Sequence, residues 1–247
     1  MDNDDLPRGR LLSRREALGL LGASGVMLFV GCAGASDLTG STTDDTTTSG
    51  CVVRPELTEG PYYVDEELNR SDIRSDPSDG TVKAGALLAL TFNVSRLASN
   101  ACSVLEGAIV DVWHCDALGV YSDVSDSGFN TVGKKFLRGY QVTNASGVAQ
   151  FTTIYPGWYS GRAVHIHFKI RSAAGAGTAY EFTSQLFFND TLTDQVHAEQ
   201  PYASKGQRDT RNANDGIYNQ GGSQLVLNVT ETSSGYAATF DIALQDV

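Results

Sequence analysis

The stretch that decides the fold runs from residue 163 to residue 170 and has the sequence Ala-Val-His-Ile-His-Phe-Lys-Ile. β-Branched and aromatic residues in such a run favour an extended strand. Because alternate residues of a strand point to the same face, His165 and His167 emerge side by side. Two imidazoles at this spacing can chelate one metal ion. The chain has only four histidines, and the pair leaves two interpretations open: a metal site, or surface and hydrogen-bonded histidines.

The sequence around this strand is also rich in β-strand patterns. Apolar or alternating runs are separated by clusters of Gly, Asn, Asp and Ser, and only residues 191–199 have a helical pattern. We therefore predict an all-β fold, a β-sandwich whose long loops carry the metal site. Besides Ala163–Ile170, the predicted strands are Leu87–Leu97, Ala108–His114, Leu137–Thr143, Ala149–Tyr155, Glu181–Phe188, Leu225–Thr230 and Ala237–Leu244.

Residues 1–32 predict a signal peptide. Four arginines precede an apolar run at 17–30, which is shorter than the roughly 18 residues that a spanning helix needs. The pair Arg14-Arg15 resembles a twin-arginine signal, with Ala17 where Phe is usual. Residues 29–32, Phe-Val-Gly-Cys, resemble a lipobox with Phe in place of Leu. Either a lipidated Cys32 attaches the protein to the membrane, or an ordinary signal peptide carries a fortuitous cysteine; both predict export, as a secreted protein or a cell-envelope lipoprotein.

Residues 33–50 predict a disordered linker, and the folded domain is expected at 51–247. The linker consists mostly of Ser, Thr, Gly and Asp, which bury too little apolar surface to offset the entropy of ordering. Export would place Cys51, Cys102 and Cys115 in an oxidising compartment, where two of the three are expected to pair. The sequence does not decide which two.

The charge of the chain excludes one class of partner. Its formal net charge is −11, whereas nucleic-acid binding needs clustered Lys and Arg to displace phosphate counterions. We therefore expect no nucleic-acid partner.

Two tyrosines are candidates to complete the coordination of a metal. Tyr159 lies in a turn just before the histidine strand, and Tyr121 follows the predicted strand 108–114. Phenolate is a hard, charged oxygen donor, so two phenolates favour Fe(III) over Fe(II) or zinc. Either tyrosine alone is better explained as a residue at a sheet edge, because the chain has 10 tyrosines. A cupin site is disfavoured, since residues 168–172 contain no carboxylate.

Together these segments resemble the intradiol ring-cleavage dioxygenases, which include protocatechuate 3,4-dioxygenase and catechol 1,2-dioxygenase. The resemblance covers nearly all of the folded part. Each segment is a weak signal alone, whereas their order and spacing are specific. The segments are Thr-Glu-Gly-Pro-Tyr-Tyr (58–63), Asp-Val-Trp-His (111–114), Gly-Val-Tyr-Ser (119–122), Tyr-Pro-Gly-Trp-Tyr (155–159), Arg-Ala-Val-His-Ile-His-Phe (162–168) and Thr-Ser-Gln-Leu (183–186).

The resemblance implies a non-haem enzyme with one Fe(III) per chain. It would use O2 to cleave catechol-type rings between the two hydroxyl carbons and release muconate-type diacids. The implied iron ligands are Tyr121, Tyr159, His165 and His167, with Tyr159 leaving the metal when substrate binds. Arg162 matches the family's arginine beside the iron. Gln185 matches its glutamine, although residues 173–180 lengthen the spacing from the histidines.

Some features depart from the family pattern or stay open. Tyr62, Tyr63 and Trp158 are candidate substrate-binding residues, with a place in the core as the alternative. Residues 161–164 are Gly-Arg-Ala-Val where Trp-Arg-Pro-Ala is common, which argues against recognition of a carboxylate and thus against protocatechuate. Residues 33–62 are too short and polar for the helical dimerisation segment of the catechol branch, and the oligomeric state stays open.

Two histidines outside the strand are not expected to bind metal. His114 is predicted to be structural and His197 to be solvated. Two other functions are weighed against the iron(III) enzyme. One is a non-catalytic, transthyretin-like β-sandwich binding module on the cell envelope. The other is an extradiol enzyme, which would need Fe(II) and normally two histidines with one carboxylate.

Overall fold

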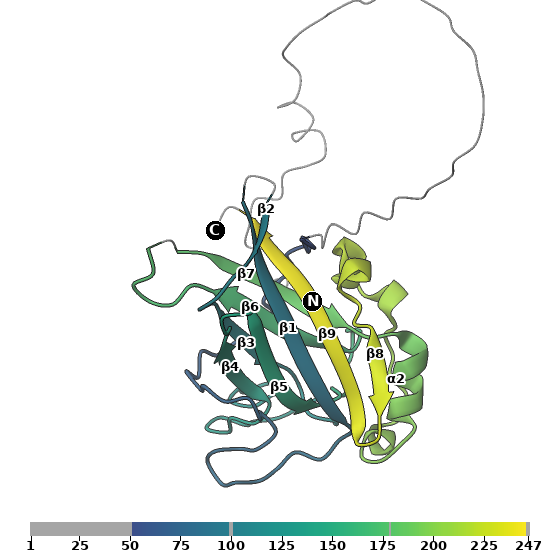
Figure 1. The fold of residues 1–247 in the computed structure, drawn as a ribbon. Coiled ribbons are helices and arrows are strands. Elements are labelled where there is room, and N and C mark those ends of the chain that lie inside the picture. Colours follow the sequence, from purple (N-terminus) through teal and green to yellow (C-terminus); the bar gives the residue numbers. More distant parts are fainter. Residues whose placement is uncertain (1–50, 99–100, 178, 246–247) are drawn as a thin grey trace, which may run out of the picture. The chain divides into compact units, whose positions relative to one another are not determined.

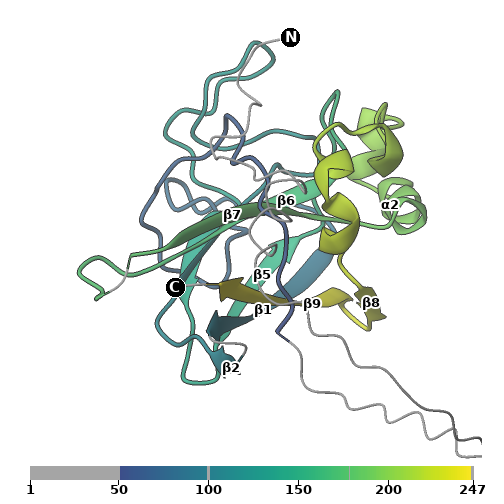
Figure 2. The same cartoon turned by 90° about the horizontal axis from the view of Figure 1, so that it is seen from above.

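The computed structural model describes residues 51–98, 101–177 and 179–245, and the predicted signal peptide and linker lie outside these ranges. The described chain forms two β-sheets (Figures 1 and 2). In the first sheet, β1 pairs in parallel with β9, and β8 pairs with the far side of β9; the other edge of β1 is shared by β5 and β2. These strands are β1 Leu87–Ala98, β2 Ala101–Val104, β5 Val148–Ile154, β8 Val229–Thr232 and β9 Gly235–Gln245.

The second sheet has four antiparallel strands in the order β4-β3-β6-β7. Apolar residues from both sheets form one core between them. The ring of Phe168 lies 5.3 Å from that of Phe92 and 5.5 Å from that of Phe240, measured between centroids. Face-to-face packing of this kind makes a β-sandwich. The strands are β3 Ile109–Trp113, β4 Arg138–Val142, β6 His165–Arg171 and β7 Glu181–Phe187.

Strand β6 is buried on both faces, which is unusual for a strand in a two-layer fold. Ile166, Phe168 and Ile170 point into the core, and the residues between them point to the outer face of the sheet. That outer face is covered by the segment before β1: Lys169 forms an ion pair with Glu59. The histidines therefore lie beneath loops on the outer face and not between the two sheets.

The helices are short and lie on the same side of the molecule as β8 (Figures 1 and 2). The side chain of Asn189 caps the N-terminus of α2 by accepting the N–H groups of Thr191 and Leu192. None of the helices within the described ranges is long and apolar enough to cross a membrane. The helices are α2 Asp190–His197 and the 3-10 helices η2 Tyr202–Lys205, η3 Asn212–Asn214, η4 Tyr218–Gln220 and η5 Gly222–Leu225.

Most predicted elements are confirmed, including the helix, and two strands differ. The strand predicted at 225–230 begins only at Val229, because Leu225 and Leu227 cover the core from a 3-10 helix and the segment after it. Strand β2 was not predicted at all. All four of its residues are exposed, so it has no alternation of apolar and polar residues.

A disulfide joins Cys51 to Cys102 and ties the start of the described chain to β2. The two residues are 51 positions apart. Closing a loop of that length in the unfolded chain corresponds to about 4 kcal/mol of stability in the chain-entropy model. Cys115 is the remaining free cysteine among the described residues, and it is buried.

Candidate metal centre

The two histidines of β6 lie side by side on the outer face of the sheet. Their Nε2 atoms are 2.9 Å apart, and both side chains are almost fully buried. The Nδ1 atom of His165 lies 2.6 Å from the carbonyl oxygen of Ala163, so Nδ1 carries the proton and Nε2 presents a lone pair. Burial, together with the positive charge of Arg162, lowers the pKa of His165 to about 3. Burial likewise lowers the pKa of His167, so both imidazoles are neutral, the form that binds metal ions.

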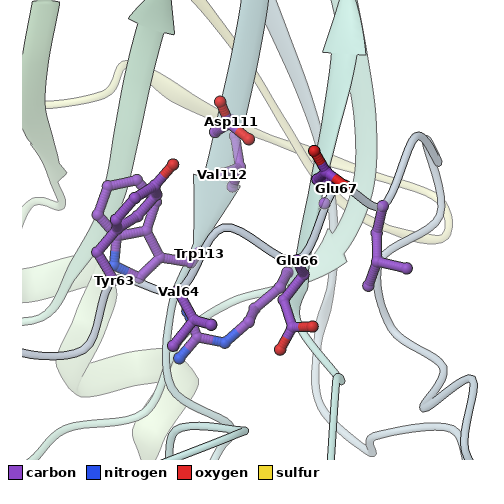
Figure 3. A pocket seen from close by; sticks show the side chains of 10 residues that line it. Tyr63, Val64, Glu66, Glu67, Asp111, Val112 and Trp113 are labelled. Carbon is purple, nitrogen blue, oxygen red and sulfur yellow. The ribbon is translucent and has the colours of Figure 1, made fainter.

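Backbone and aromatic groups hold His167 in place. The indole of Trp113, its cross-strand neighbour on β3, stacks on its ring at 5.0 Å with an interplanar angle of 9°. Trp113 also contacts Tyr63, 4.8 Å away, at the wall of a small pocket (Figure 3). Gly60 has a φ of +73°, and a Cβ there would lie 3.2 Å from Cε1 of His167. A residue with a side chain would be both strained and crowded at this position.

Two interlocked turns bring Tyr121 and Tyr159 to the histidines. The N–H of Gly157 donates to the carbonyl of Asp116 at 3.1 Å. A Cβ on Gly157 would lie only 2.4 Å from the carbonyl oxygen of Ala117, so backbone packs directly on backbone here. This close approach requires glycine, and it explains why two turns far apart in sequence present their tyrosines at one place.

The four predicted ligands form a single cluster of rings. The ring centroid of Tyr121 lies 5.8 Å from that of Tyr159 and 6.2 Å from that of His167. The Tyr159 ring lies 5.7 Å from that of His165, with its Oη 3.5 Å from the Nε2 atom. The structure thus brings together side chains from three separate stretches of the chain.

Tyr121 supplies the test of whether these residues fit a metal. It is 1% exposed, and within the described part of the chain its hydroxyl has no hydrogen-bond partner. A buried hydroxyl without a partner costs about 1–3 kcal/mol. Burial, followed by the charge of Tyr159, raises the pKa of Tyr121 well above its ordinary value. A bound cation would supply the missing partner and favour the phenolate, so the donor set fits a metal ion.

Arg162 is held rigidly beside this cluster. It is 8% exposed; its Nε donates to Asp215 at 3.0 Å and its Nη2 to Oε1 of Gln185 at 2.6 Å. Gln185 in turn donates to the carbonyl of Thr58. Burial alone would lower the pKa of Arg162, but Tyr159 and Asp215 raise it further than burial lowers it. The guanidinium is therefore a fixed cation, and both residues predicted from the family resemblance lie together.

Asp215 is a residue that the sequence analysis missed. Its carboxylate also accepts the N–H of Ala163, and it organises the turn that follows by accepting the N–H groups of Ile217 and Tyr218. Burial would raise the pKa of Asp215, but Arg162 and these N–H groups hold it below its ordinary value. The carboxylate therefore stays ionised and fixes Arg162.

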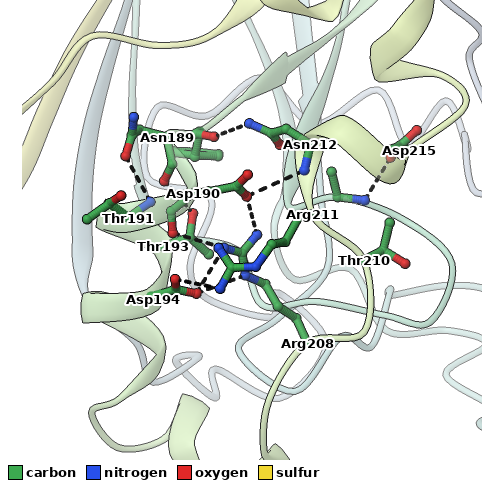
Figure 4. A network of polar contacts seen from close by, with 12 residues as sticks. Asn189, Asp190, Thr191, Thr193, Asp194, Arg208, Thr210, Arg211, Asn212 and Asp215 are labelled. Atoms are coloured by element: carbon green, nitrogen blue, oxygen red, sulfur yellow. Dashed lines mark hydrogen bonds and ion pairs between the residues drawn. The ribbon is translucent and has the colours of Figure 1, made fainter.

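A network of ion pairs anchors the loop that carries Asp215 (Figure 4). Arg208 binds Asp190 and Asp194 of α2, and Arg211 binds Asp194 at 2.8 Å. The amide of Asn212 donates to the carbonyl of Phe188. Because several ion pairs and hydrogen bonds hold the loop, its position does not depend on any single one of them.

The three predicted substrate-binding residues lie in different places. Tyr62 belongs to the ring cluster: it stacks on Tyr121 at 4.5 Å, meets the edge of Tyr159 at 6.0 Å and donates its hydroxyl to Asp126 at 2.6 Å. Tyr63 faces Trp113 and lies under the ammonium of Lys169 instead. Trp158 packs against Lys205 and donates to the carbonyl of Gly206. Phe129, 6.4 Å from Tyr62, is a further aromatic residue that was not predicted.

The remaining histidines behave differently from each other. His114 is structural, as predicted: it is fully buried and bonded to the carbonyl of Cys115 and the hydroxyl of Thr153. The prediction for His197 is wrong. Its ring is half-buried, stacks on Tyr202 at 5.0 Å and lies 3.0 Å from the carbonyl oxygen of Pro156. His197 therefore supports the turn that carries Tyr159.

No group of three or more His, Cys, Asp and Glu side chains in the described ranges could hold a metal ion. The candidate centre combines imidazoles with phenols.

The chain is similar in sequence and in fold to known dioxygenases. A family model described as dioxygenase matches residues 58–246. No curated protein matches the chain. An intradiol ring-cleavage dioxygenase from Tetranychus urticae is 30% identical, with 80% of this chain and 96% of that chain covered and a TM-score of 0.69.

Two bacterial structures are also similar. The dioxygenase domain of a dioxygenase and carbohydrate-binding protein fusion from Streptomyces sp. SirexAA-E is 27% identical over 79% of this chain and 100% of that chain, with a TM-score of 0.56. Catechol 1,2-dioxygenase from Pseudomonas arvilla is 26% identical over 77% of this chain and 62% of that chain, with a TM-score of 0.52.

Proposed function

The chain belongs to the intradiol ring-cleavage dioxygenase family, and from this premise we propose that it is an iron(III) enzyme that opens catechol-type rings between their two hydroxyl carbons. Membership of the family makes the protein a ring-cleavage dioxygenase, an oxidoreductase that incorporates both atoms of O2. It thereby decides against the non-catalytic binding module. The metal, the ligands and the products are parts of the proposal.

One observation carries the proposal: two neutral imidazoles and two phenols meet at one place. The buried hydroxyl of Tyr121 finds no partner in the described chain, and the Nε2 atoms of His165 and His167 face each other at 2.9 Å. Phenolate oxygens favour a hard, highly charged ion, which supports Fe(III) over Fe(II) or zinc. We assign Tyr121, Tyr159, His165 and His167 as the ligands of one Fe(III) ion.

Ferric iron held there would act as a Lewis acid that binds the catechol oxygens and withdraws charge from the ring. Tyr159 is the half-exposed donor, and on leaving the metal its phenolate would take a proton from the entering catechol. Tyr121 is buried and stays in place. Tyr62 stacks on Tyr121 and adds an aromatic face beside the site.

Arg162 acts on the charge that develops during the reaction. Asp215 and Gln185 fix its guanidinium before substrate arrives, so no reorganisation is needed when negative charge builds up on the ring. Preorganised stabilisation of this kind is usually the largest single contribution to catalysis. Cleavage between the hydroxyl carbons gives a muconate-type diacid.

Loading the purified protein with Fe(III) is expected to give a visible absorption band, because iron-bound tyrosinate absorbs visible light. Addition of catechol should consume O2 in a one-to-one ratio and form a colourless muconate. A chelator should remove both the band and the activity, and Fe(III) should restore both. An iron-replete but colourless protein, or a yellow ring-fission product, would contradict the assignment.

We also propose that the protein is exported. The arginine pair Arg14-Arg15 with its apolar run supports this, and the Cys51–Cys102 disulfide is of a kind that persists in oxidising compartments. The twin-arginine route carries folded proteins, so iron could be loaded before export.

Replacing Arg14 and Arg15 with lysines in the full chain is expected to leave unprocessed precursor in the cytoplasm. Fractionation of cells, followed by detection of the protein, measures this. Incorporation of labelled palmitate into the wild type but not into Cys32→Ser would identify a lipoprotein, and its absence from both would identify a secreted protein. Normal export of the lysine variant would contradict the twin-arginine route.

A further inference from the structure

Arg138, at the start of β4, is a buried charge that the mechanism does not use. It is 2% exposed, and no carboxylate of the described residues lies within ion-pair distance of its guanidinium. A buried charge without an ion-pair partner is costly, and natural structures rarely keep one without compensation. The hydrogen bonds of this guanidinium must therefore offset the cost of burying its charge.

The guanidinium is directed at the residue that follows Tyr121. Nη2 of Arg138 donates to the carbonyl of Ser122 at 2.7 Å, and Nε donates to the same carbonyl at 3.2 Å and to the Ser122 hydroxyl at 2.9 Å. The Ser122 hydroxyl itself donates a hydrogen bond to the carbonyl of Phe136 at 2.6 Å. The carbonyl of Tyr121 itself accepts the hydroxyl of Thr131 at 2.6 Å. The backbone on the C-terminal side of Tyr121 is thus fixed at two consecutive carbonyls.

The backbone that delivers Arg138 is strained. Leu137 has a φ of +56°, a left-handed conformation that costs a residue other than glycine about 1–3 kcal/mol. The conformation is held by hydrogen bonds from the Leu137 N–H to the carbonyl of Ile73 and from the His114 N–H to the Leu137 carbonyl. Because the fold keeps this strain in a buried, bulky residue, we infer that the position of the next side chain, Arg138, matters.

Arg138 is also related to the histidine side of the candidate metal centre. It is the cross-strand partner of Trp113, whose indole stacks on His167. Its Nη1 atom has no partner in the described chain, and neither has Nε1 of Trp113. Both residues line the small pocket of Figure 3, which at about 10 Å³ has room for one water molecule. Arg138 therefore bonds to the residue that follows Tyr121, and it pairs in the sheet with Trp113, which stacks on His167.

We propose that Arg138 is a positioning residue that holds Tyr121 in the orientation needed to bind the metal, an inference that rests on the function proposed above. It touches neither the substrate nor the reacting atoms. Its planar guanidinium donates two N–H groups to the carbonyl of Ser122, and lysine cannot reproduce that geometry. Partners that orient a metal ligand commonly contribute 10–100-fold in metal affinity.

The test compares Arg138→Met and Arg138→Lys with the wild type. Competition titration with a chelator gives the Kd for Fe(III), and the visible spectrum gives the position of the tyrosinate band for each iron bound. We expect Arg138→Met to raise the Kd at least tenfold and to shift the band, with a smaller change in Arg138→Lys. If the methionine variant does not fold, the lysine variant, which keeps the charge and one donor, decides.

Arg54→Met is the matched control. Arg54 also donates to two backbone carbonyls, those of Asp241 and Gln224, but it lies over Phe240 away from the ring cluster. Its loss should reduce stability and leave the Kd and the band unchanged. A folded Arg138→Lys or Arg138→Met protein with the wild-type Kd and band would overturn the inference and leave the proposed function standing. A wild-type protein that binds no Fe(III) would overturn the proposed function itself.

Discussion

Replacing His165 by alanine is expected to abolish Fe(III) binding and ring cleavage while the sandwich stays folded. His165 contributes its Nε2 atom to the ring cluster, and its side chain lies on the outer face of β6, away from the core residues Ile166 and Phe168. Removing one of the four proposed ligands should lower the rate by more than about 1,000-fold, because in the proposed mechanism the metal is the Lewis acid. Stability should change by only about 1–3 kcal/mol.

The measurements are iron content, the visible spectrum, O2 uptake with catechol and the free energy of unfolding. His114→Gln is the matched control, because His114 is equally buried but bonds to Cys115 and Thr153. It should lose stability and keep iron and colour. A His165→Ala protein with full iron content and an unchanged visible band would show that the ligand assignment is wrong.

Replacing Arg162 by alanine is expected to lower kcat by about 100- to 1,000-fold with the iron content unchanged. This is the loss typical when one preorganised donor of transition-state stabilisation is removed. Asp215→Asn should also lower kcat, but less, because its single amide oxygen still accepts the N–H groups of Ile217 and Tyr218 while the charge that fixes the guanidinium is lost. The double variant should be no slower than Arg162→Ala, since both changes remove one function.

Asp194→Asn is the control for this series. Asp194 lies in the network that anchors the same loop and binds Arg208 and Arg211, not Arg162. It should cost a little stability and leave kcat unchanged, which would show that weakening the anchor of this loop does not by itself slow the reaction. Loss of iron from Arg162→Ala would mean that the arginine is structural. Strictly additive losses in the double variant would mean that Asp215 acts independently.

Local patterns in the sequence predicted most of the fold and the histidine pair. The strand period of two residues places His165 and His167 on one face, and the structure confirms that they meet. The two tyrosines were candidates by residue type and position alone, and their assignment as ligands came from the resemblance to a family, because each lies in a turn and no periodicity connects them. Their meeting depends on Gly157 packing against the backbone of Asp116, a contact between distant residues.

The residues that were missed also depend on distant contacts. Asp215 lies in Asn-Asp-Gly, a sequence typical of an ordinary turn, and its partner Arg162 is 53 residues away. Arg138 has a strand position that by itself predicts nothing about burial. The strand predicted at 225–230 was shifted because apolar residues can also cover a core from a 3-10 helix. A single sequence contains no signal for such pairings beyond the residue types themselves.

The double burial of β6 ties catalysis to the register of one strand. Side chains alternate with a period of two, so a slip by a single residue would turn both imidazoles toward the apolar interior and aim Ile166 and Phe168 at the tyrosines. The pairing that satisfies the interior is thus the same pairing that aims the nitrogens. Whenever the sheet is correctly assembled, the imidazole nitrogens therefore point toward the tyrosines. Correct pairing of β6 is itself the step that builds the binding site.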